Sequence, residues 1–357
     1  MKVCILGAGL SSLTLAKAMV NKKIYVDVIS TQKIKNIDQT RTLGISKSNV
    51  DYFNSNIIDI ENISWNLKKI EIYSDNLQNE KLLNFENNND HLFSMVRNNE
   101  LYNLIDASLL KNNFFKKINF YKKNLLDQYD LIINTEYNHA ITKKYFNKKI
   151  IKKYSSYAFT TIIEHDNIIN NVAIQIFTKN GPLAFLPISN FETSVVYSFK
   201  HSKINNKENI TELIKKYNIK YKIKTIKKIN SFELKSLNLR SYYYKNILAF
   251  GDLLHRIHPL AGQGFNMTIR DIEVLLNIIS DKSKLGLSVD SMVGMEFEKI
   301  LKHKNLIFSN GIDLIYEFFN FERNMKSNMI SKSIQLLGKN PNINKFFKKV
   351  ADKGIQF

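Results

Sequence analysis

The chain has 357 residues, of which 44% are hydrophobic and 24% are charged, and its formal net charge is +20. This composition excludes an intrinsically disordered chain, and the length suits about two domains with a sizeable core. A sequence pI of about 9.6 raises the question of an anionic partner.

Lysine carries most of this positive charge. Nucleic-acid sites favour Arg, because its guanidinium makes bidentate contacts, whereas the lysines here are spread along the whole chain beside abundant Asn and Ile. We therefore attribute the charge to a bias in composition and predict no nucleic-acid partner. An anionic membrane surface is the better candidate, since each Lys near one contributes about 1 kcal/mol. The 52 basic residues include six arginines: Arg41, Arg97, Arg240, Arg256, Arg270 and Arg323.

The chain has one cysteine, Cys4, which excludes an intramolecular disulfide framework and fits a reducing compartment. No run reaches the ~18 uninterrupted apolar residues of a transmembrane helix. The apolar stretch from Lys2 to Val20 resembles a signal peptide, but Lys17 and a glycine-rich turn interrupt it. We therefore expect a cytoplasmic protein. The single Cys and the scattered His residues predict no metal site.

The chain begins with the pattern of a parallel α/β sheet. Residues 2–6 predict a buried strand, Gly7-Ala8-Gly9 a turn, residues 10–21 a helix and residues 24–29 a second strand. A strand, a turn, a helix and a strand in this order are typical of a doubly wound fold.

Further elements follow, although residues 31–90 are largely irregular in pattern. Residues 157–200 hold several strand-like runs and no helical pattern, which indicates an antiparallel sheet. From residue 291 the chain is helical and rich in Phe, with a break predicted at Asn340-Pro341. The other predicted strands are 68–74, 81–85, 118–121, 129–134 and 247–250, and the other predicted helices are 97–111, 210–217 and 266–280.

Glycine and proline are scarce, and their positions are informative. Nine of these 16 residues fall within the windows 7–9, 181–187 and 251–264, and none lies between Gly44 and Gly181. These residues provide backbone geometries that others do not, so their clustering predicts that the three windows form sites.

The first window has the context of a dinucleotide-binding turn, because it follows a strand and opens a helix. Gly7 permits the tight turn, Gly9 lets a pyrophosphate approach the backbone, and Leu10-Ser11 begin the helix whose amides bind the anion. Ser12 stands in place of the third glycine of the motif. Ser30 stands where an acidic ribose ligand usually ends the second strand. An ordinary α/β turn remains the alternative.

The third window is more specific. Residues 250–266 are Phe-Gly-Asp-Leu-Leu-His-Arg-Ile-His-Pro-Leu-Ala-Gly-Gln-Gly-Phe-Asn, after a predicted strand and before a predicted helix. This stretch resembles the signature of FAD-dependent aromatic-ring monooxygenases, in the branch of the ubiquinone-biosynthesis hydroxylases. The resemblance implies that Asp252, after Gly251, binds a ribityl hydroxyl of FAD. It also implies that the turn around the flavin ring contains Pro259, Gly262, Gln263, Gly264, Phe265 and Asn266.

Other segments extend the resemblance over nearly the whole chain. Residues 41–46 are similar to a family segment whose Arg, here Arg41, contacts the cofactor. Asn98 opens a predicted helix that is similar to the helix following that segment in the family. The second window is similar to a substrate-domain strand that faces the flavin. The residues implied to face the ring are Pro182, Leu183, Pro259 and Gly262. No catalytic side chain is identified, because the flavin carries the chemistry.

The resemblance implies an α/β fold in which a Rossmann-like FAD-binding domain is interleaved with a substrate domain built on a mixed or antiparallel sheet. The implied reaction uses NAD(P)H and O2 to hydroxylate a lipid-soluble polyprenylated phenol in ubiquinone biosynthesis. Such a substrate predicts peripheral contact with the inner face of the cell membrane and partners in a biosynthetic complex. The expected divisions are 1–75, 94–155 and 241–285 for the FAD-binding domain, 76–93 and 156–240 for the substrate domain, and 286–357 for C-terminal helices.

The chain departs from the family pattern at one motif. Where the family carries Gly-Ala-Asp-Gly after a strand, residues 134–137 are Asn-Thr-Glu-Tyr. That motif is linked in the family to FAD and to nicotinamide use. Two alternatives therefore stay open. One is an FAD monooxygenase or reductase acting on another aromatic or isoprenoid substrate, and the other is a non-catalytic relative that serves as a scaffold.

Two groups of side chains have a structural and a functional interpretation. His255 and His258 are interpreted as packing residues of their loop rather than catalytic groups. The aromatic residues of the C-terminal region either pack the terminal helices or dock on a membrane beside Lys345, Lys348 and Lys349. These aromatics are Phe297, Phe308, Phe318, Phe319, Phe321, Phe346 and Phe347.

Overall fold

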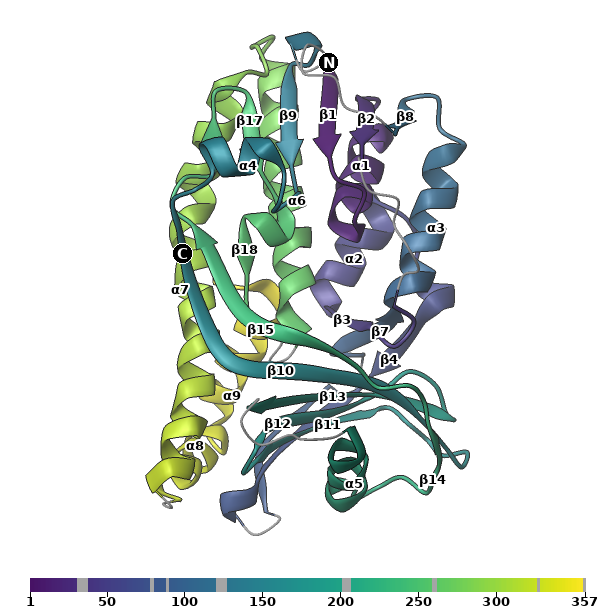
Figure 1. Ribbon diagram of the computed structural model, residues 1–357, viewed down its shortest axis with the longest axis vertical. Coiled ribbons are helices and arrows are strands. Elements are labelled where there is room, and N and C mark those ends of the chain that lie inside the picture. Colours follow the sequence, from purple (N-terminus) through teal and green to yellow (C-terminus); the bar gives the residue numbers. More distant parts are fainter. Residues whose placement is uncertain are drawn as a thin grey trace.

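The computed structural model describes residues 1–30, 38–77, 80–87, 90–119, 127–200, 207–258, 262–325 and 328–355. Two sheets dominate the fold: a mainly parallel sheet, and a larger, mostly antiparallel sheet that lies below it in Figure 1. The arrows of β1 (Lys2–Leu6) and β9 (Leu131–Asn134) point toward the larger sheet. The carboxyl ends of the parallel strands, where open α/β sheets bind ligands, therefore face it.

β1 lies in the middle of the parallel sheet, between β2 and β9. Residues 3–6 of β1 are all buried, as expected for a strand in the interior of a parallel sheet. Helices α1 and α3 pack against each other beside this sheet (Figure 1). The remaining members are β2 (Tyr25–Ile29), β8 (Phe115–Ile118), β17 (Ile247–Ala249), β16 (Tyr243–Tyr244), α1 (Leu10–Asn21) and α3 (Asn98–Leu110).

The larger sheet has the order β18-β15-β10-β13-β12-β11-β5-β6, with β14 paired to β10. β10 is 17 residues long and curves from the upper to the lower part of the molecule (Figure 1). Helix α5 covers the lower face. The strands and α5 are β5 (Lys69–Ser74), β6 (Lys81–Glu86), β10 (Lys149–His165), β11 (Val172–Thr178), β12 (Gly181–Pro187), β13 (Glu192–Lys200), β14 (Ile223–Ile226), β15 (Asn230–Leu239), β18 (His255–Arg256) and α5 (Lys207–Tyr217).

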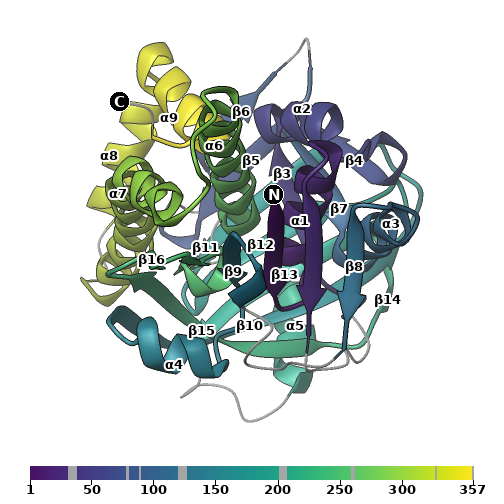
Figure 2. The ribbon, with the colours of Figure 1, turned by 90° about the horizontal axis from the view of Figure 1, so that it is seen from above.

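A small third sheet, in the order β3-β7-β4, lies below α2 and above the larger sheet in Figure 1. In the described part of the chain, no helix combines the length and the apolarity needed to cross a membrane. Figure 2 shows α7, α8 and α9 together on the side of the molecule away from α3. These elements are β3 (Thr42–Ser46), β4 (Ser64–Leu67), β7 (Phe93–Arg97), α2 (Lys47–Asn56), α4 (Ala140–Tyr145), α6 (Gln263–Lys284), α7 (Ser291–Met325), α8 (Met329–Gly338) and α9 (Pro341–Lys353), with short 3-10 turns η1 (Glu61–Ile63), η2 (Asp75–Leu77) and η5 (Gly251–Leu253).

The predicted fold class is confirmed: a parallel Rossmann-like sheet, an antiparallel sheet and C-terminal helices are all present. The predicted break at Asn340-Pro341 is confirmed as well. Asn340 caps α9, because its side-chain oxygen accepts hydrogen bonds from the amides of Asn342 and Ile343, and Pro341 occupies the first turn.

Some elements differ from the sequence pattern. The strand predicted at 118–121 begins earlier, at Phe115, because an edge strand can leave Lys116 and Lys117 in water. Residues 120 and 121 of that prediction lie outside the described residues. Two strands of the third sheet, β3 and β4, and helix α2 fall within residues 31–90, where the sequence pattern is largely irregular, and β7 follows directly after this stretch. The first half of β10 has no strand pattern that we predicted. The division into domains stays a prediction; its boundary between 155 and 156 falls inside β10, where Ser155 has a left-handed backbone (φ 50°).

The turn into β12 explains one glycine of the second window. Gly181 has φ 147°, and a Cβ at this position would lie 2.0 Å from the carbonyl oxygen of Ser198 on β13. No side chain fits there without moving the backbone of a central strand pair.

We predict that Gly181→Ala lowers the free energy of unfolding by about 3 kcal/mol, through backbone strain and overpacking. Urea denaturation followed by circular dichroism measures the change. Gly311→Ala in α7 is the control, since no atom lies within 4 Å of its added Cβ and Ala favours a helix, so about 1 kcal/mol of stabilisation is expected. Equal effects of the two substitutions would contradict the assignment of strain to Gly181.

Candidate functional site

The β1–α1 turn is open toward a ligand on one side and closely packed on the other. Gly7 has φ 108°, and a Cβ there would lie 2.4 Å from Oγ1 of Thr135, which follows β9. Gly9 is exposed, and apart from its two chain neighbours no atom of the described residues lies within 4 Å of a Cβ placed on it. Position 7 therefore needs glycine for internal packing, whereas position 9 leaves space above the backbone.

The start of α1 supplies donors to this open space. Gly9 is the N-cap and has no side chain to bond the amides of the first turn, which carries no acidic residue. The free amides of Leu10-Ser11 and the helix dipole favour an anion there.

The turn after β9 occupies the space below Gly7. The hydroxyl of Thr135 donates to the carbonyl oxygen of Leu6 (2.8 Å) and accepts from the hydroxyl of Ser12 (2.8 Å). Ser12 replaces the third glycine of the nucleotide motif, and Thr135 belongs to the segment that departs from the family pattern. The two residues that depart from the family pattern, Ser12 and Thr135, are therefore hydrogen-bonded to each other.

Glu136 lies beside the same turn, on the opposite side of Gly7 from Ser30. Its Cγ lies 2.9 Å from a Cβ placed on Gly7, its side chain is half-buried, and burial raises the pKa of its carboxyl. Ser30 follows β2, on the other neighbour of β1, and its amide donates to Ile118. The sequence marked residue 136 only by the missing motif and did not indicate that an acidic side chain lies at the nucleotide turn.

The segment after β17 contacts the start of α1. Gly251 has φ 63°, and a Cβ on it would lie 3.0 Å from the Cβ of Ser11. Asp252, the next residue, is exposed. A hydrogen bond attaches this segment to α6, since Nε2 of His255 lies 2.5 Å from Oδ2 of Asp271 and both side chains are buried.

The start of α6 contacts β3. Gly262 is exposed, has a left-handed backbone (φ 64°), and a Cβ on it would lie 3.7 Å from the amide nitrogen of Gly44. Asn266, which is fully buried, donates to the carbonyl oxygen of Gly44 (2.7 Å) and accepts from the amide of Ser46 (2.8 Å) and the side chain of Asn49 (2.8 Å). Asn266 thus holds two segments together.

Gln263 and Phe265 share this turn with Gly264. The side-chain nitrogen of buried Gln263 donates to the carbonyl oxygen of Ala351, so this part of α6 is attached to the C-terminal segment. Phe265 is half-buried beside Phe53, and among the described residues no atom outside the helix's own backbone and the neighbouring residues lies within 4 Å of a Cβ placed on Gly264. Pro259 lies outside the described residues.

Arg41 and Asn98 join the same region through β3 and β7. The amide of Asn98 donates to the carbonyl oxygen of Arg41 (3.0 Å), and the exposed Arg41 guanidinium lies 5.3 Å from the ring centre of Phe232 on β15. The hydroxyl of Thr42 donates to that of Ser194 on β13 (2.8 Å), which ties β3 to the larger sheet.

The upper face of the larger sheet forms the floor below these segments. Ser194 pairs with Leu186, so residues alternating with Leu186 along β12, including Ala184 and Pro182, share its face. Leu183 lies on the opposite face, in the core beneath α5 with Ile210. Adjacent strand residues point to opposite faces, so Pro182 and Leu183 cannot both face the same ring.

The structure therefore connects the three windows through a continuous series of contacts, which we call the line of segments. The contacts run from Thr135 through the Gly7 turn to Ser11 and Gly251, and from Gly262 through Gly44 to the larger sheet. Within the described ranges, no group of three or more His, Cys, Asp and Glu side chains is placed to hold a metal ion.

His258 lies at the end of the described part of this loop, and it is buried between aromatic rings. The rings of Tyr154 and Tyr316 lie 5.0 Å and 4.4 Å from its own. Burial, with a smaller contribution from Lys152, lowers the pKa of His258 to about 4. The packing interpretation of this residue agrees with these surroundings.

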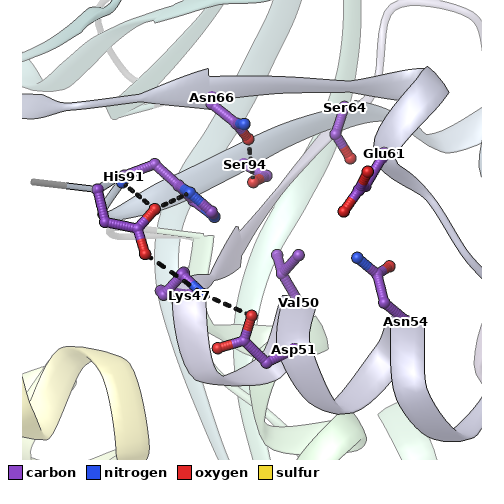
Figure 3. A pocket seen from close by; sticks show the side chains of 10 residues that line it. Lys47, Val50, Asp51, Asn54, Glu61, Ser64, Asn66, His91 and Ser94 are labelled. Atoms are coloured by element: carbon purple, nitrogen blue, oxygen red, sulfur yellow. Dashed lines mark hydrogen bonds and ion pairs between the residues drawn. The ribbon is translucent and has the colours of Figure 1, made fainter.

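A cavity of about 400 Å³ lies outside this line of segments, between α2, η1, β4 and β7 (Figure 3). Lys47 lies between two carboxylates, with its Nζ 2.5 Å from Asp51 and 3.4 Å from Asp90. Figure 3 shows its ion pair with Asp51. The hydrogen bond to Asp51 raises the pKa of Lys47. None of the predicted site residues lines this cavity.

Known proteins share parts of the sequence and the fold of this chain. No family model matches the chain. The chain is 26% identical over 174 residues to the 3-demethoxyubiquinol 3-hydroxylase of Escherichia coli, and 27% identical over 191 residues to the mitochondrial ubiquinone biosynthesis monooxygenase COQ6 of Danio rerio. The alignments cover 47% and 42% of this chain and 44% and 40% of those relatives. The chain is a distant homologue of the ubiquinone hydroxylases.

Solved structures show the fold. The p-nitrophenol 4-monooxygenase of Pseudomonas putida superposes with a TM-score of 0.76 at 13% identity, covering 99% of this chain and 98% of that one. HpxO of Klebsiella pneumoniae, in complex with FAD and uric acid, superposes with a TM-score of 0.74 at 12% identity, covering 99% and 97%. The resemblance inferred from the sequence is thus confirmed as a shared fold and a distant homology. The matched segments span about two fifths of the length of the first two ubiquinone hydroxylases.

The contact between Ser12 and Thr135 can be measured. We predict a coupling of about 1 kcal/mol in a double-mutant cycle of Ser12→Ala and Thr135→Val, because each variant removes one side of the same hydrogen bond. Urea denaturation gives the four free energies of unfolding. A cycle of Ser12→Ala with the distant Thr178→Val serves as the control and should be additive within about 0.5 kcal/mol. Additivity in the first cycle would show that the two departures do not interact.

The burial of His258 predicts a pH dependence of stability. Below pH 6.5 the unfolded chain binds a proton at this position, whereas the folded chain does so only near pH 4, so stability falls as the pH falls through this window. From pH 6.5 to about pH 5 the expected loss is about 2 kcal/mol, and His258→Asn should remove it. Urea denaturation across this range measures the slope. His303→Gln, at an exposed position, should leave it unchanged.

Proposed function

We propose that the chain is an FAD-dependent monooxygenase that uses NAD(P)H and O2 to hydroxylate the aromatic ring of a polyprenylated phenol in ubiquinone biosynthesis. The observation that carries the proposal is the close approach of Gly251 to Ser11 together with the hydrogen bonds that join Asn266 to Gly44 and Ser46. These contacts assemble segments distant in sequence at the carboxyl ends of the parallel strands, where this fold binds nucleotides. The homology to ubiquinone hydroxylases supports the substrate class.

The residues present fit FAD. The pyrophosphate would lie over Gly9 at the start of α1, where the backbone is exposed and amides are free. The exposed carboxylate of Asp252 would accept a ribityl hydroxyl, and Ser30 a ribose hydroxyl. The open space above Gly264 leaves room for a ring at the start of α6. Arg41, Asn98, Gln263, Phe265 and Asn266 complete the proposed set, Asn266 by holding Gly44 in place.

When bound, FAD would supply both the acceptance of hydride from NAD(P)H and the transfer of oxygen. The chain itself binds, orients and shields the reactants. The α6 N-terminus directs amides and a positive dipole toward negative charge near the ring. Below it, Ala184 contributes a small side chain to the face of the larger sheet on which an aromatic substrate would lie. Pro182 shares that face and remains a candidate to contact the ring.

Two other functions are the alternatives to this proposal. The loss of the Gly-Ala-Asp-Gly motif at 134–137 favours a non-catalytic scaffold, if nicotinamide use depends on it. A change of substrate would give a monooxygenase or reductase on another aromatic or isoprenoid compound. The hydrogen bond between Ser12 and Thr135 shows that the altered turn is well packed rather than collapsed, and this favours retained nucleotide binding. Peripheral membrane contact and partners in a biosynthetic complex belong to the same proposal.

The test is reconstitution of the purified protein with FAD, followed by its absorption spectrum and titration with NADH or NADPH under anaerobic conditions. We predict FAD binding, reduction by one of the two nucleotides, and O2-dependent hydroxylation of a prenylated phenol. Reduction without hydroxylation would favour the reductase, and binding without reduction the scaffold. No bound flavin after reconstitution would exclude the proposal.

Gly9→Asp combined with Asp252→Ala provides a variant that should fold and yet not bind FAD. Gly9 has φ −70° and ψ 173°, which suit Asp, and Asp is a favourable N-cap, so the stability of α1 is kept. The new carboxylate repels the pyrophosphate, so no binding is expected at micromolar FAD. Asp281→Ala, at the far end of α6, is the matched control and should bind FAD as the unmodified protein does.

A further inference from the structure

The hairpin of α8 and α9 has an unusual composition. From Met329 to Lys353 it contains six lysines and a single acidic residue, Asp352. Large apolar side chains are exposed on the same two helices, with exposed fractions of 74% at Met329, 66% at Leu336 and 61% at Phe346. Exposed apolar groups among lysines are typical of helices that lie in the plane of a membrane interface.

The inward faces of both helices are attached to the edge strand β6. Gly338 packs against Leu83 so closely that a Cβ on it would lie 2.1 Å from a methyl carbon. The side chains of α8 and α9 also donate to backbone oxygens of this strand. These hydrogen bonds are Gln335 to Lys81 (2.9 Å), Asn344 to Asn84 (3.1 Å) and Lys348 to Glu86 (2.6 Å). The hairpin therefore covers the sheet edge and turns its opposite face to solvent.

The outward face alternates apolar and basic residues at helical spacing. On α8, Met329, Lys332, Leu336 and Lys339 follow one another at intervals of three or four. On α9 the exposed face carries Phe346 with Lys345, Lys349 and Lys353. The lysines are long enough to reach lipid headgroups while the apolar side chains enter the interface.

The acidic residue of the hairpin does not lie on that face. The carboxylate of Asp352 accepts a hydrogen bond from the amide of Ser48 (2.8 Å), in the first turn of α2. It is therefore used inside the protein, as an anion at a helix N-terminus. The outward face carries positive charge alone and is complementary to an anionic surface.

The last turn of α9 is attached to the proposed flavin turn. The carbonyl oxygen of Ala351 accepts from Gln263 (3.1 Å), and that of Asp352 accepts from Ser46 (2.9 Å) and Arg270 (3.4 Å). Gln263 and Arg270 lie on α6, and Ser46 ends β3. Hydrogen bonds thus couple the last turn of α9 to α6 and to β3, the two elements that approach each other at Gly262 and Gly44.

We propose that the α8–α9 hairpin docks on an anionic phospholipid bilayer and that docking orders the start of α6. The interfacial helices would bring the protein to the phase that holds a lipid-soluble phenol. The significance of the ordering rests on the proposed function, since the start of α6 is the proposed flavin turn. The docking itself does not depend on FAD.

The first experiment is flotation of the full-length protein, without FAD, with vesicles of phosphatidylcholine alone or in an equimolar mixture with phosphatidylglycerol. Binding is expected to the mixture alone. Lys345→Gln with Lys349→Gln should weaken it about 30-fold, at about fivefold for each lysine near the surface. Lys215→Gln with Lys216→Gln on α5 removes the same charge elsewhere and should have no effect. Equal loss in both variants, or no binding to either vesicle, would overturn the docking; an acidic protein would then be the partner to seek.

The second experiment is hydrogen–deuterium exchange of the same FAD-free protein with and without the mixed vesicles. Slower exchange is expected in α9 and also at residues 263–268, and Phe346→Ser should abolish both changes. Protection confined to α9 would refute the ordering of α6. Because neither measurement uses FAD, a failure of flavin reconstitution and a failure of docking give separate results.

Discussion

The candidate site depends on one buried amide. Asn266 lies in the first turn of α6, yet three of its hydrogen bonds go to residues 44–49, more than 200 positions earlier in the chain. A buried amide that is fully bonded fixes two segments more strictly than apolar contact does, since each missed bond leaves a polar group unpaired at a cost of about 1–3 kcal/mol. Through Asn266 the left-handed turn at Gly262 is kept against Gly44, and β3 in turn is tied to the larger sheet by Thr42 and Ser194. The position of any ring between the two sheets follows from this pair of attachments.

The opposite end of the site shows how a motif can change without loss of packing. A glycine at position 12 would leave Thr135 without the hydroxyl of Ser12, and a smaller residue at 135 would leave that hydroxyl without its acceptor. The pair fills the space below Gly7 and leaves the exposed backbone at Gly9 unaltered. The change at 136 is of another kind, because it places a half-buried carboxyl whose pKa is raised beside a turn suited to phosphate. Packing and charge are thus altered independently at neighbouring positions.

Sequence patterns predicted what depends on neighbours in the chain. The strand, turn and helix at residues 2–21, the break at Asn340-Pro341 and the three windows rich in glycine and proline all follow from local backbone requirements. Sequence patterns could not show that Thr135 contacts Ser12 or that Gln263 contacts Ala351, because these contacts join segments far apart in the chain. The expectation for Leu183 shows another limit. The window was located correctly as a strand of the larger sheet, but which of two adjacent residues faces upward depends on register with β13, and register is set by tertiary packing.

The functional effect of the lysines depends on where they lie on the surface more than on how many there are. Spread over the whole surface, an excess charge of +20 mainly favours solubility and weak attraction to anions. On α8 and α9 the same residue type alternates with Met, Leu and Phe side chains that the fold leaves in water, while the acidic group of that segment is used at the N-terminus of α2. Among the C-terminal aromatics, Phe297, Phe308 and Phe319 are buried, whereas Phe318, Phe321, Phe346 and Phe347 are exposed, so packing accounts for some of them and not for the others. A compositional bias supplies lysines everywhere, and the attachment of this hairpin to β6 determines where they share a face with apolar groups.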